Sequence, residues 1–149
     1  MIAAPLPGSV LFACGMNSVR SPMAEALMKS LHGSRIYVDS VGVRSRPVDP
    51  FVIEVMKEVG LDVARHKPKT FDTLADTSFD VVIAMSPEAQ HKAIEMTRTM
   101  ACEVEYWPTF DPTIVEGRRD QTLQAYRDVR DQLLRRIRVR FPLPSVPDL

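Results

Sequence analysis

Two cysteines among 149 residues are too few for the disulfide framework that stabilises many small secreted domains. Charge of one sign is also lacking, because 19 Lys and Arg balance 19 Asp and Glu. A formal net charge of zero gives no overall signature for binding nucleic acid or an anionic membrane. No apolar run approaches the roughly 20 residues that a membrane-spanning helix requires. These absences favour a protein of the reducing cytoplasm, with no nucleic-acid partner and no membrane partner.

The two ends of the sequence also lack features of targeting segments. Residues 1–8 carry no basic region, and Pro5 and Pro7 interrupt their short apolar patch, so we expect an N-terminal tail that is neither a signal peptide nor an anchor. Residues 142–149 include three prolines and are typical of a C-terminal tail. The length fits one domain over residues 1–149.

Apolar runs and helically spaced apolar residues alternate along the chain, which predicts an α/β fold with a parallel sheet and helices on both of its faces. Residues 79–85 form a near-continuous apolar run, typical of a central strand that is covered on both sides. The expected strands are 10–13, 36–41, 79–85 and 102–107, and the expected helices are 22–31, 50–59, 87–100 and 117–140.

The segment from Ser9 to Glu25 carries the clearest chemical signal. An apolar strand ends at Cys14, and five residues separate Cys14 from Arg20. A loop of this length can curl so that its backbone N–H groups point inward, and the helix that follows adds its positive N-terminal end. Such a cradle binds a tetrahedral oxyanion and favours the thiolate form of Cys14, which is the form that attacks as a nucleophile.

Other residues of this segment fit the same cradle. The planar guanidinium of Arg20 can hold two oxygens of a phosphoryl group at once. Asn17 suits a loop position with positive φ. We expect Ser21 to be the N-cap of the next helix, with Pro22 at its first position. The alternative is a buried structural cysteine beside a surface arginine.

The motif from Cys14 to Pro22 resembles that of the low-molecular-weight protein tyrosine phosphatases, whose loop reads Cys-x5-Arg-Ser-Pro after the first strand, and the resemblance extends from Ser9 to about Arg138. It implies a four-stranded parallel sheet of order 2-1-3-4 with the phosphate-binding loop after strand 1. Two positions depart from the family pattern, because Met16 replaces the usual glycine and Val19 replaces a cysteine common in the family. The implied phosphate-binding residues are Gly15, Met16, Asn17, Ser18, Val19, Arg20 and Ser21.

The resemblance also implies roles for three residues outside the loop. Ser40, at the end of the second strand, would support the loop by hydrogen bonding, although a plain turn serine is the alternative. His66 matches a histidine that bonds the loop asparagine, or it is a surface histidine in a basic turn. Asp111, in an Asp-Pro pair after the last strand, matches the family's general acid. We expect it to be buried beside Trp107 and Phe110. The alternative is an ordinary turn, in which Asp-Pro is common.

These expectations together predict a cysteine-dependent phosphomonoester hydrolase without metal or cofactor, of the protein tyrosine phosphatase kind. Its catalytic residues would be Cys14, Arg20 and Asp111, and its substrate a phosphorylated protein or a small aryl phosphate. The family's phosphotyrosine-specific members have an aromatic residue near positions 43–48, which this chain lacks; its Arg44 and Arg46 suit either an acidic peptide or a solvated loop. The sequence does not indicate an oligomeric state.

Two alternative functions remain at this point. Arsenate fits the same cradle, and related arsenate reductases share the expected fold. The thioredoxin-coupled type uses three cysteines, whereas this chain has two, and we expect Cys102 to begin the fourth strand about 16 Å from the active edge of the sheet. Only a reductase that uses external glutathione therefore competes with the hydrolase. The other alternative is a phosphate-binding module without turnover, a possibility that Met16 leaves open.

Overall fold

Four parallel strands form a single sheet in the computed structural model, which describes residues 5–74 and 78–144. The order across the sheet is β2-β1-β3-β4, as expected, and every neighbouring pair is parallel. β1 and β3 therefore lie in the middle, which explains their near-continuous apolar sequences. The strands are β1 (Ser9–Cys14), β2 (Tyr37–Gly42), β3 (Val81–Ala84) and β4 (Glu103–Tyr106).

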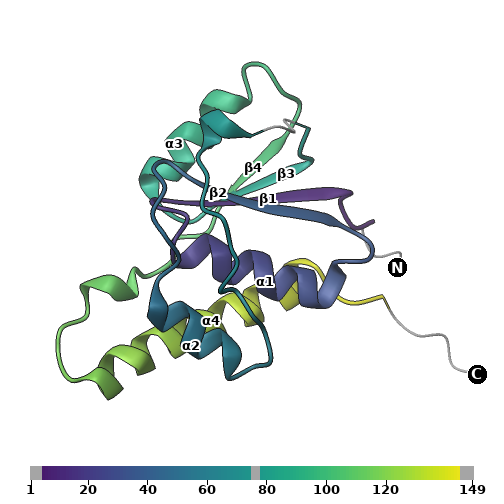
Figure 1. The fold of residues 1–149 in the computed structure, drawn as a ribbon. Coiled ribbons are helices and arrows are strands. Elements are labelled where there is room, and N and C mark those ends of the chain that lie inside the picture. The colour runs from purple at the N-terminus through teal and green to yellow at the C-terminus, as the bar shows by residue number, and fades with distance from the viewer. Residues whose placement is uncertain (1–4, 75–77, 145–149) are drawn as a thin grey trace, which may run out of the picture.

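Helices cover both faces of the sheet. Figure 1 shows α1, α2 and α4 together on one face and α3 on the other. The sequence alternates strand and helix, so each crossover returns the chain to the same edge and the carboxyl ends of all four strands meet there. The helices are α1 (Arg20–His32), α2 (Pro50–Lys57), α3 (Pro87–Met96) and α4 (Arg119–Arg140), with 3-10 turns η1 (Phe71–Thr73) and η2 (Pro112–Ile114).

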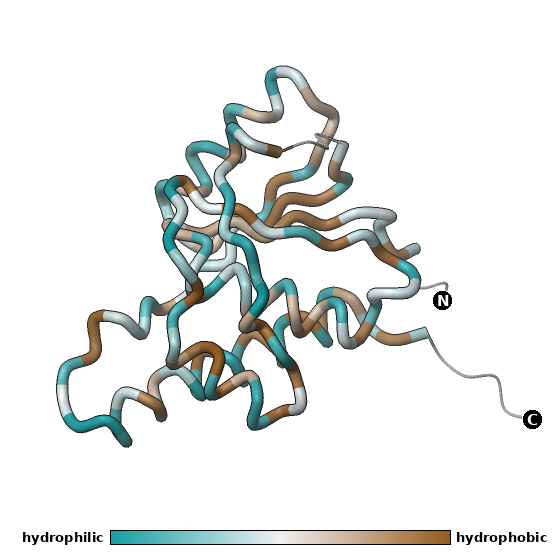
Figure 2. The backbone as a smooth tube through the Cα atoms, viewed as in Figure 1, coloured by the Kyte–Doolittle hydropathy of each residue, from teal (hydrophilic) through white to brown (hydrophobic). Residues whose placement is uncertain are grey.

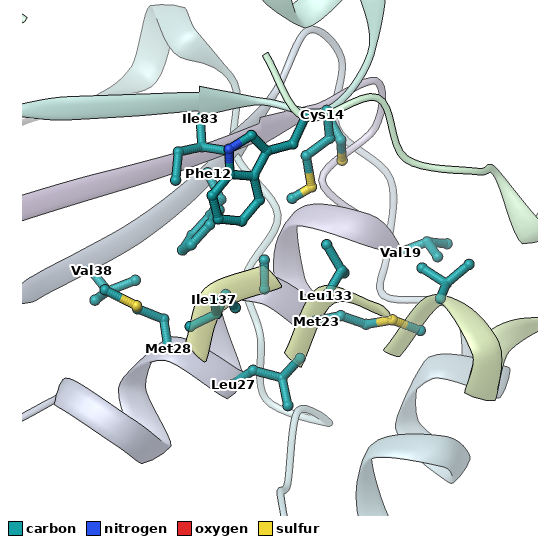
Figure 3. Packing of buried hydrophobic residues seen from close by; sticks show 14 of the residues in the cluster. Phe12, Cys14, Val19, Met23, Leu27, Met28, Val38, Ile83, Leu133 and Ile137 are labelled. Carbon is teal, nitrogen blue, oxygen red and sulfur yellow. The ribbon is translucent and has the colours of Figure 1, made fainter. Parts of the chain in front are cut away.

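The larger hydrophobic core lies between the sheet and the face covered by α1, α2 and α4. Figure 3 shows Phe12 of β1 pointing toward Met23 of α1 and Leu133 and Ile137 of α4, and all four side chains are almost completely inaccessible to water. A smaller cluster lies under α3. The apolar colour in Figure 2 is accordingly concentrated on the strands of the sheet. This packing fixes the first strand and the first helix, and with them the loop that joins them.

The start of α1 differs from the expectation. The helix begins at Arg20, and Val19 is its N-cap, without a side-chain capping bond. The expectation that Ser21 caps the helix is therefore wrong. Ser21 lies within the first turn, and its hydroxyl contacts Cys14, Asn17 and Val41 instead. Several other predicted boundaries differ by a few residues; α3, for example, ends at Met96 rather than about Met100.

The expected tails, residues 1–8 and 142–149, lie partly outside the described residues, since residues 1–4 and 145–149 are not described. Within the described part, Leu6 packs against the larger core, and the Gly8 N–H donates to Asp80 Oδ2 over 2.8 Å. No helix in the described ranges is long and apolar enough to cross a membrane.

Candidate active site

The loop between β1 and α1 forms a cradle at the carboxyl edge of the sheet. Its carbonyl oxygens are turned outward, because those of Gly15, Met16 and Ser18 accept hydrogen bonds from the backbone of residues 44, 46 and 49. Within the described part of the chain, none of the N–H groups of residues 15–19 donates to a protein acceptor. Unpaired backbone donors gathered at a helix N-terminus are the hallmark of an anion site.

Asn17 holds the cradle in shape. It is the one non-glycine residue of the described chain with a positive φ, at 52°. Its buried side chain donates to Ser21 Oγ and Ser40 Oγ, both over 2.9 Å, and its Oδ1 accepts from His66 Nε2 and from the Lys69 backbone N–H, both over 3.0 Å. Four hydrogen bonds therefore fix a backbone conformation that a side chain otherwise disfavours.

The Ser21 hydroxyl lies 2.9 Å from Cys14 Sγ and 3.3 Å from the Val41 carbonyl oxygen. Ser21 Oγ accepts from Asn17, and its single proton can go either to the Val41 carbonyl oxygen or to the nearer sulfur. A hydrogen bond donated to the sulfur stabilises the thiolate over the thiol. Ser21 thus belongs to the environment of Cys14, which is itself almost completely buried.

The support network extends to Glu25, a residue that the sequence analysis did not identify. Glu25 Oε1 accepts from Ser40 Oγ over 2.5 Å, and Glu25 Oε2 pairs with Lys29 Nζ at the same distance. His66 Nδ1 lies 3.9 Å from Glu25 Oε1. Glu25 lies four residues after Ser21 on α1 and therefore on the same face of the helix. This spacing is the sequence signal from which its place in the network could have been predicted.

Burial lowers the pKa of His66 below its ordinary value of 6.5. An amide oxygen can only accept, so His66 Nε2 must carry the proton that binds Asn17 Oδ1. The neutral imidazole is therefore the tautomer with its hydrogen on Nε2, and Nδ1 faces Glu25 without a proton.

A cavity of about 160 Å³ opens above the cradle. Its lining includes Cys14, Arg20 and Asp111, so the structure brings the three predicted catalytic residues to one space. Arg20 Nη1 donates to the Thr109 carbonyl oxygen over 3.1 Å, which ties the start of α1 to the segment after β4. The other lining residues are Met16, Ser18, Val19, Arg46, Asp49 and Thr113.

The surroundings of Asp111 differ from the expectation of burial beside two aromatic rings. Asp111 is only half-buried, and Phe110 is half-exposed to solvent. Trp107 is buried, but its ring packs on Phe12 and Phe141 inside the core. Asp111 Oδ1 instead accepts from the N–H and the hydroxyl of Thr113, over 3.0 and 2.7 Å. These two bonds fix the carboxyl group at the rim of the cavity.

A second carboxylate, Asp49, lines the same cavity and was not identified from the sequence as part of the site. It caps α2, because Oδ1 accepts from the Phe51 N–H over 2.8 Å. Its Oδ2 accepts from the buried Tyr126 hydroxyl of α4 over 2.7 Å, and burial together with this contact raises the pKa of Tyr126. Of the two loop arginines, Arg46 lines the cavity, whereas Arg44 pairs with Glu88.

The second thiol lies far from the first. Ala13 pairs with Ala84, and Ala84 with Tyr106, so Cys14 is level with the residue after Tyr106. Cys102 is five residues before that level and two strands away, which separates the two Cα atoms by roughly 19 Å. A disulfide needs Cα atoms within about 7 Å, so Cys14 and Cys102 cannot pair in this fold. Both cysteines are free.

Comparison with known proteins agrees with the geometry of the cradle. The family described as low molecular weight phosphotyrosine protein phosphatase matches residues 9–138. The chain belongs to this family. The matched range includes the cradle, Asp111 and nearly all of α4, and the expected family resemblance is confirmed over the predicted range.

Proteins similar to this chain are named as arsenate reductases or as phosphatases. A glutaredoxin arsenate reductase of Synechocystis sp. is 33% identical over 128 residues, which are 86% of this chain and 92% of that protein. An arsenate reductase structure in the phosphate binding state is 31% identical, with a TM-score of 0.67 and coverage of 88% and 94%. A tyrosine phosphatase of Erwinia amylovora shares the fold at 18% identity, with a TM-score of 0.70 and 91% coverage of both chains.

Proposed function

We propose that this protein is a cysteine-dependent phosphomonoester hydrolase that acts on phosphotyrosine-like aryl phosphates through a phosphocysteine intermediate. The observation that carries the proposal is the shared cavity in which Cys14 faces unpaired N–H groups at its floor and Asp111 stands at its rim. A binding module would need only the cradle. The acid at the rim is useful only if a bond to a leaving group is broken.

The substrate's phosphoryl group would occupy the cradle, with its oxygens on the N–H groups of residues 15–19 and on Arg20. This arrangement places phosphorus next to Cys14 Sγ, and the positive end of α1 lowers the free energy of the negatively charged transition state. Lys69 and His66 do not touch the substrate in this account, because they face the other side of Asn17.

In the first step the Cys14 thiolate attacks phosphorus, so that an S–P bond forms while the bond to the leaving oxygen breaks. Asp111 gives its proton to that oxygen as negative charge develops there. In the second step the Asp111 carboxylate takes a proton from water, and the water oxygen displaces the sulfur. The products are inorganic phosphate and the regenerated thiolate, and both protons are accounted for.

Arsenate reduction is the second candidate, because two of the relatives described above are named arsenate reductases. Arsenate could occupy the same cradle and form an adduct with Cys14. Reduction to arsenite then requires two electrons from thiols. Cys102 is too distant to supply one of them, so the reaction would need an external thiol such as glutathione.

Parallel turnover of an aryl phosphate and of arsenate tests the proposal. We expect phosphate release from para-nitrophenyl phosphate and no arsenite when arsenate is supplied with glutathione and glutaredoxin, or with thioredoxin. Cys14→Ser is the control that must remove both activities, and Cys102→Ser should change neither. Arsenite formation with negligible phosphate release would reject the hydrolase in favour of the reductase.

A further inference from the structure

The largest cavity near the cradle is not the one that contains Cys14. A space of about 590 Å³ lies between α1 and the segment of residues 61–69, on the opposite side of the Asn17 network. Figure 1 shows this segment running from the end of α2 back across α1 toward the sheet. Cavities that hold small organic ligands measure about 300–1,000 Å³, so the volume is sufficient for one.

The carboxylates of this cavity are already engaged. Glu25 is held by Ser40 and Lys29, as described above. Asp39 pairs with Lys69 Nζ at 2.5 Å. The third carboxylate, Asp62, accepts from the Ala64 N–H over 2.9 Å. Glu25 and Asp39 therefore have lysine partners, and Asp62 is held by a backbone N–H.

Two cations of the cavity are not engaged. Arg65 and Lys67 are exposed and have no hydrogen-bond or ion-pair partner within residues 5–74 and 78–144. Apolar surface from Leu61, the buried Val63 and Ala26 lies in the same space. The cavity therefore combines free positive charge with an apolar wall, which suits an organic anion better than a cation or an inorganic ion.

The cavity is connected to the cradle by direct hydrogen bonds. His66 and Lys69 line it, and both donate to Asn17 Oδ1 over 3.0 Å. On its other side Asn17 donates to Ser21 Oγ, which lies 2.9 Å from Cys14 Sγ. A ligand that displaces residues 65–69 must therefore disturb the residue that holds the cradle in shape.

We infer that this cavity is an effector site for a small organic anion, with a carboxylate or phosphate group on Arg65 and Lys67 and an apolar body on Leu61 and Val63. Binding there changes turnover at Cys14 through His66, Lys69 and Asn17. Binding of the anion in this cavity does not depend on the proposed function, whereas its effect on turnover rests on that function.

The probe for this site is benzene-1,3-dicarboxylate, which has two carboxylates and a flat apolar body but no phosphoryl group for the cradle. Amide NMR titration should show saturable shifts at residues 61–69 and at Asn17. The uncharged analogue benzene-1,3-dicarboxamide should bind at least several-fold more weakly. Saturating inorganic phosphate fills the cradle first, so that the probe can report only on the second cavity.

A double variant, Arg65→Gln with Lys67→Gln, should weaken probe binding by between about twofold and thirtyfold, as expected for the loss of two exposed charge contacts. The matched control is Lys92→Gln with Arg98→Gln, which removes the same charge from the region of α3 and should leave binding unchanged. Equal binding by the two double variants would overturn the site. Probe shifts that vanish in the presence of phosphate would overturn it as well, because they would place the probe in the cradle.

The coupling is tested by the rate of aryl phosphate hydrolysis at saturating probe. We expect the probe to change kcat, and excess substrate should not reverse this change. The double variant of Lys92 and Arg98 should still show the change, whereas the double variant of Arg65 and Lys67 should not. Binding at residues 61–69 without a shift at Asn17 or a change in kcat would overturn the coupling. If the protein hydrolyses no aryl phosphate, the proposed function fails, but the NMR titration still decides the effector site.

Discussion

Replacement of Asn17 by Ala should damage both stability and catalysis. Ala keeps the backbone but loses all four side-chain hydrogen bonds, and its Cβ remains at a φ of 52°. For a residue without a local polar side chain, this left-handed conformation costs about 1 kcal/mol. His66 Nε2–H and the Lys69 N–H lose their acceptor and would be left unpaired.

An unpaired buried donor costs about 1–3 kcal/mol. Both donors are only partly buried, so we take about 1 kcal/mol for each. Added to the backbone strain, the expected loss is about 3 kcal/mol, a large share of the roughly 5–15 kcal/mol by which a domain is usually stable. Asn17→Gly loses the same bonds without the strain, and we expect it to be about 0.5–1 kcal/mol more stable than Asn17→Ala.

Urea unfolding of the three proteins measures these differences, and aryl phosphate kinetics on the same samples measures the effect on the cradle. We expect kcat to fall in both variants, because Ser21 and the loop lose the group that positions them. An Asn17→Ala protein within about 0.5 kcal/mol of the native one, with unchanged kcat, would refute the view that this side chain holds the cradle.

Three further predictions follow from single residues. Asp111→Ala should lower turnover by roughly 10²- to 10⁴-fold for poor leaving groups and much less for activated phenols; an equal loss for all of them would indicate a structural role. Peroxide should inactivate the native enzyme, and dithiothreitol should restore little activity, because the sulfenic acid of Cys14 has no nearby thiol. Val19→Cys should recover its activity through a disulfide with Cys14. Full recovery of the native enzyme would contradict this expectation. The lowered pKa of His66 means that the unfolded chain binds more protons as the pH falls through 6.5. Between pH 8 and pH 5, the melting temperature of His66→Gln should therefore fall less than that of the native protein. An equal fall in both proteins would show that His66 does not titrate this way.

The α/β class could be predicted from the sequence because its local signals agree with one another, and the family resemblance supplied the strand order 2-1-3-4. Four apolar runs alternate with helical patterns, and parallel connection allows few arrangements. The boundaries were less certain, since Pro22 was taken to mark the first helical position. The helix starts two residues earlier, at Arg20, directly after the cradle, and no side chain caps it.

Within the site, the family resemblance led to the contacts of Ser40 and His66 with Asn17, which cross 23 and 49 residues, whereas contacts outside the family motif were not predicted. Asp111 was identified through the family resemblance, and a parallel sheet brings the carboxyl ends of its strands, which carry Cys14, Arg20 and Asp111, to one edge. The pairing of Asp49 with Tyr126 crosses 77 residues, and no local pattern announces it. Gly42 was not identified from the sequence, but a Cβ there would stand 2.6 Å from the Asn17 backbone nitrogen, so the cradle requires glycine at this position.

The proposed mechanism requires that Cys14 becomes phosphorylated during turnover. Rapid acid quenching of the enzyme with an aryl phosphate, followed by peptide mass spectrometry, detects this phosphocysteine, and Asp111→Ala should increase the amount trapped by slowing the attack of water. We expect one phosphoryl group on the peptide that contains Cys14 and none on the same peptide of Cys14→Ala. Steady phosphate release with that peptide unmodified, or full activity of Cys14→Ala, would contradict the account.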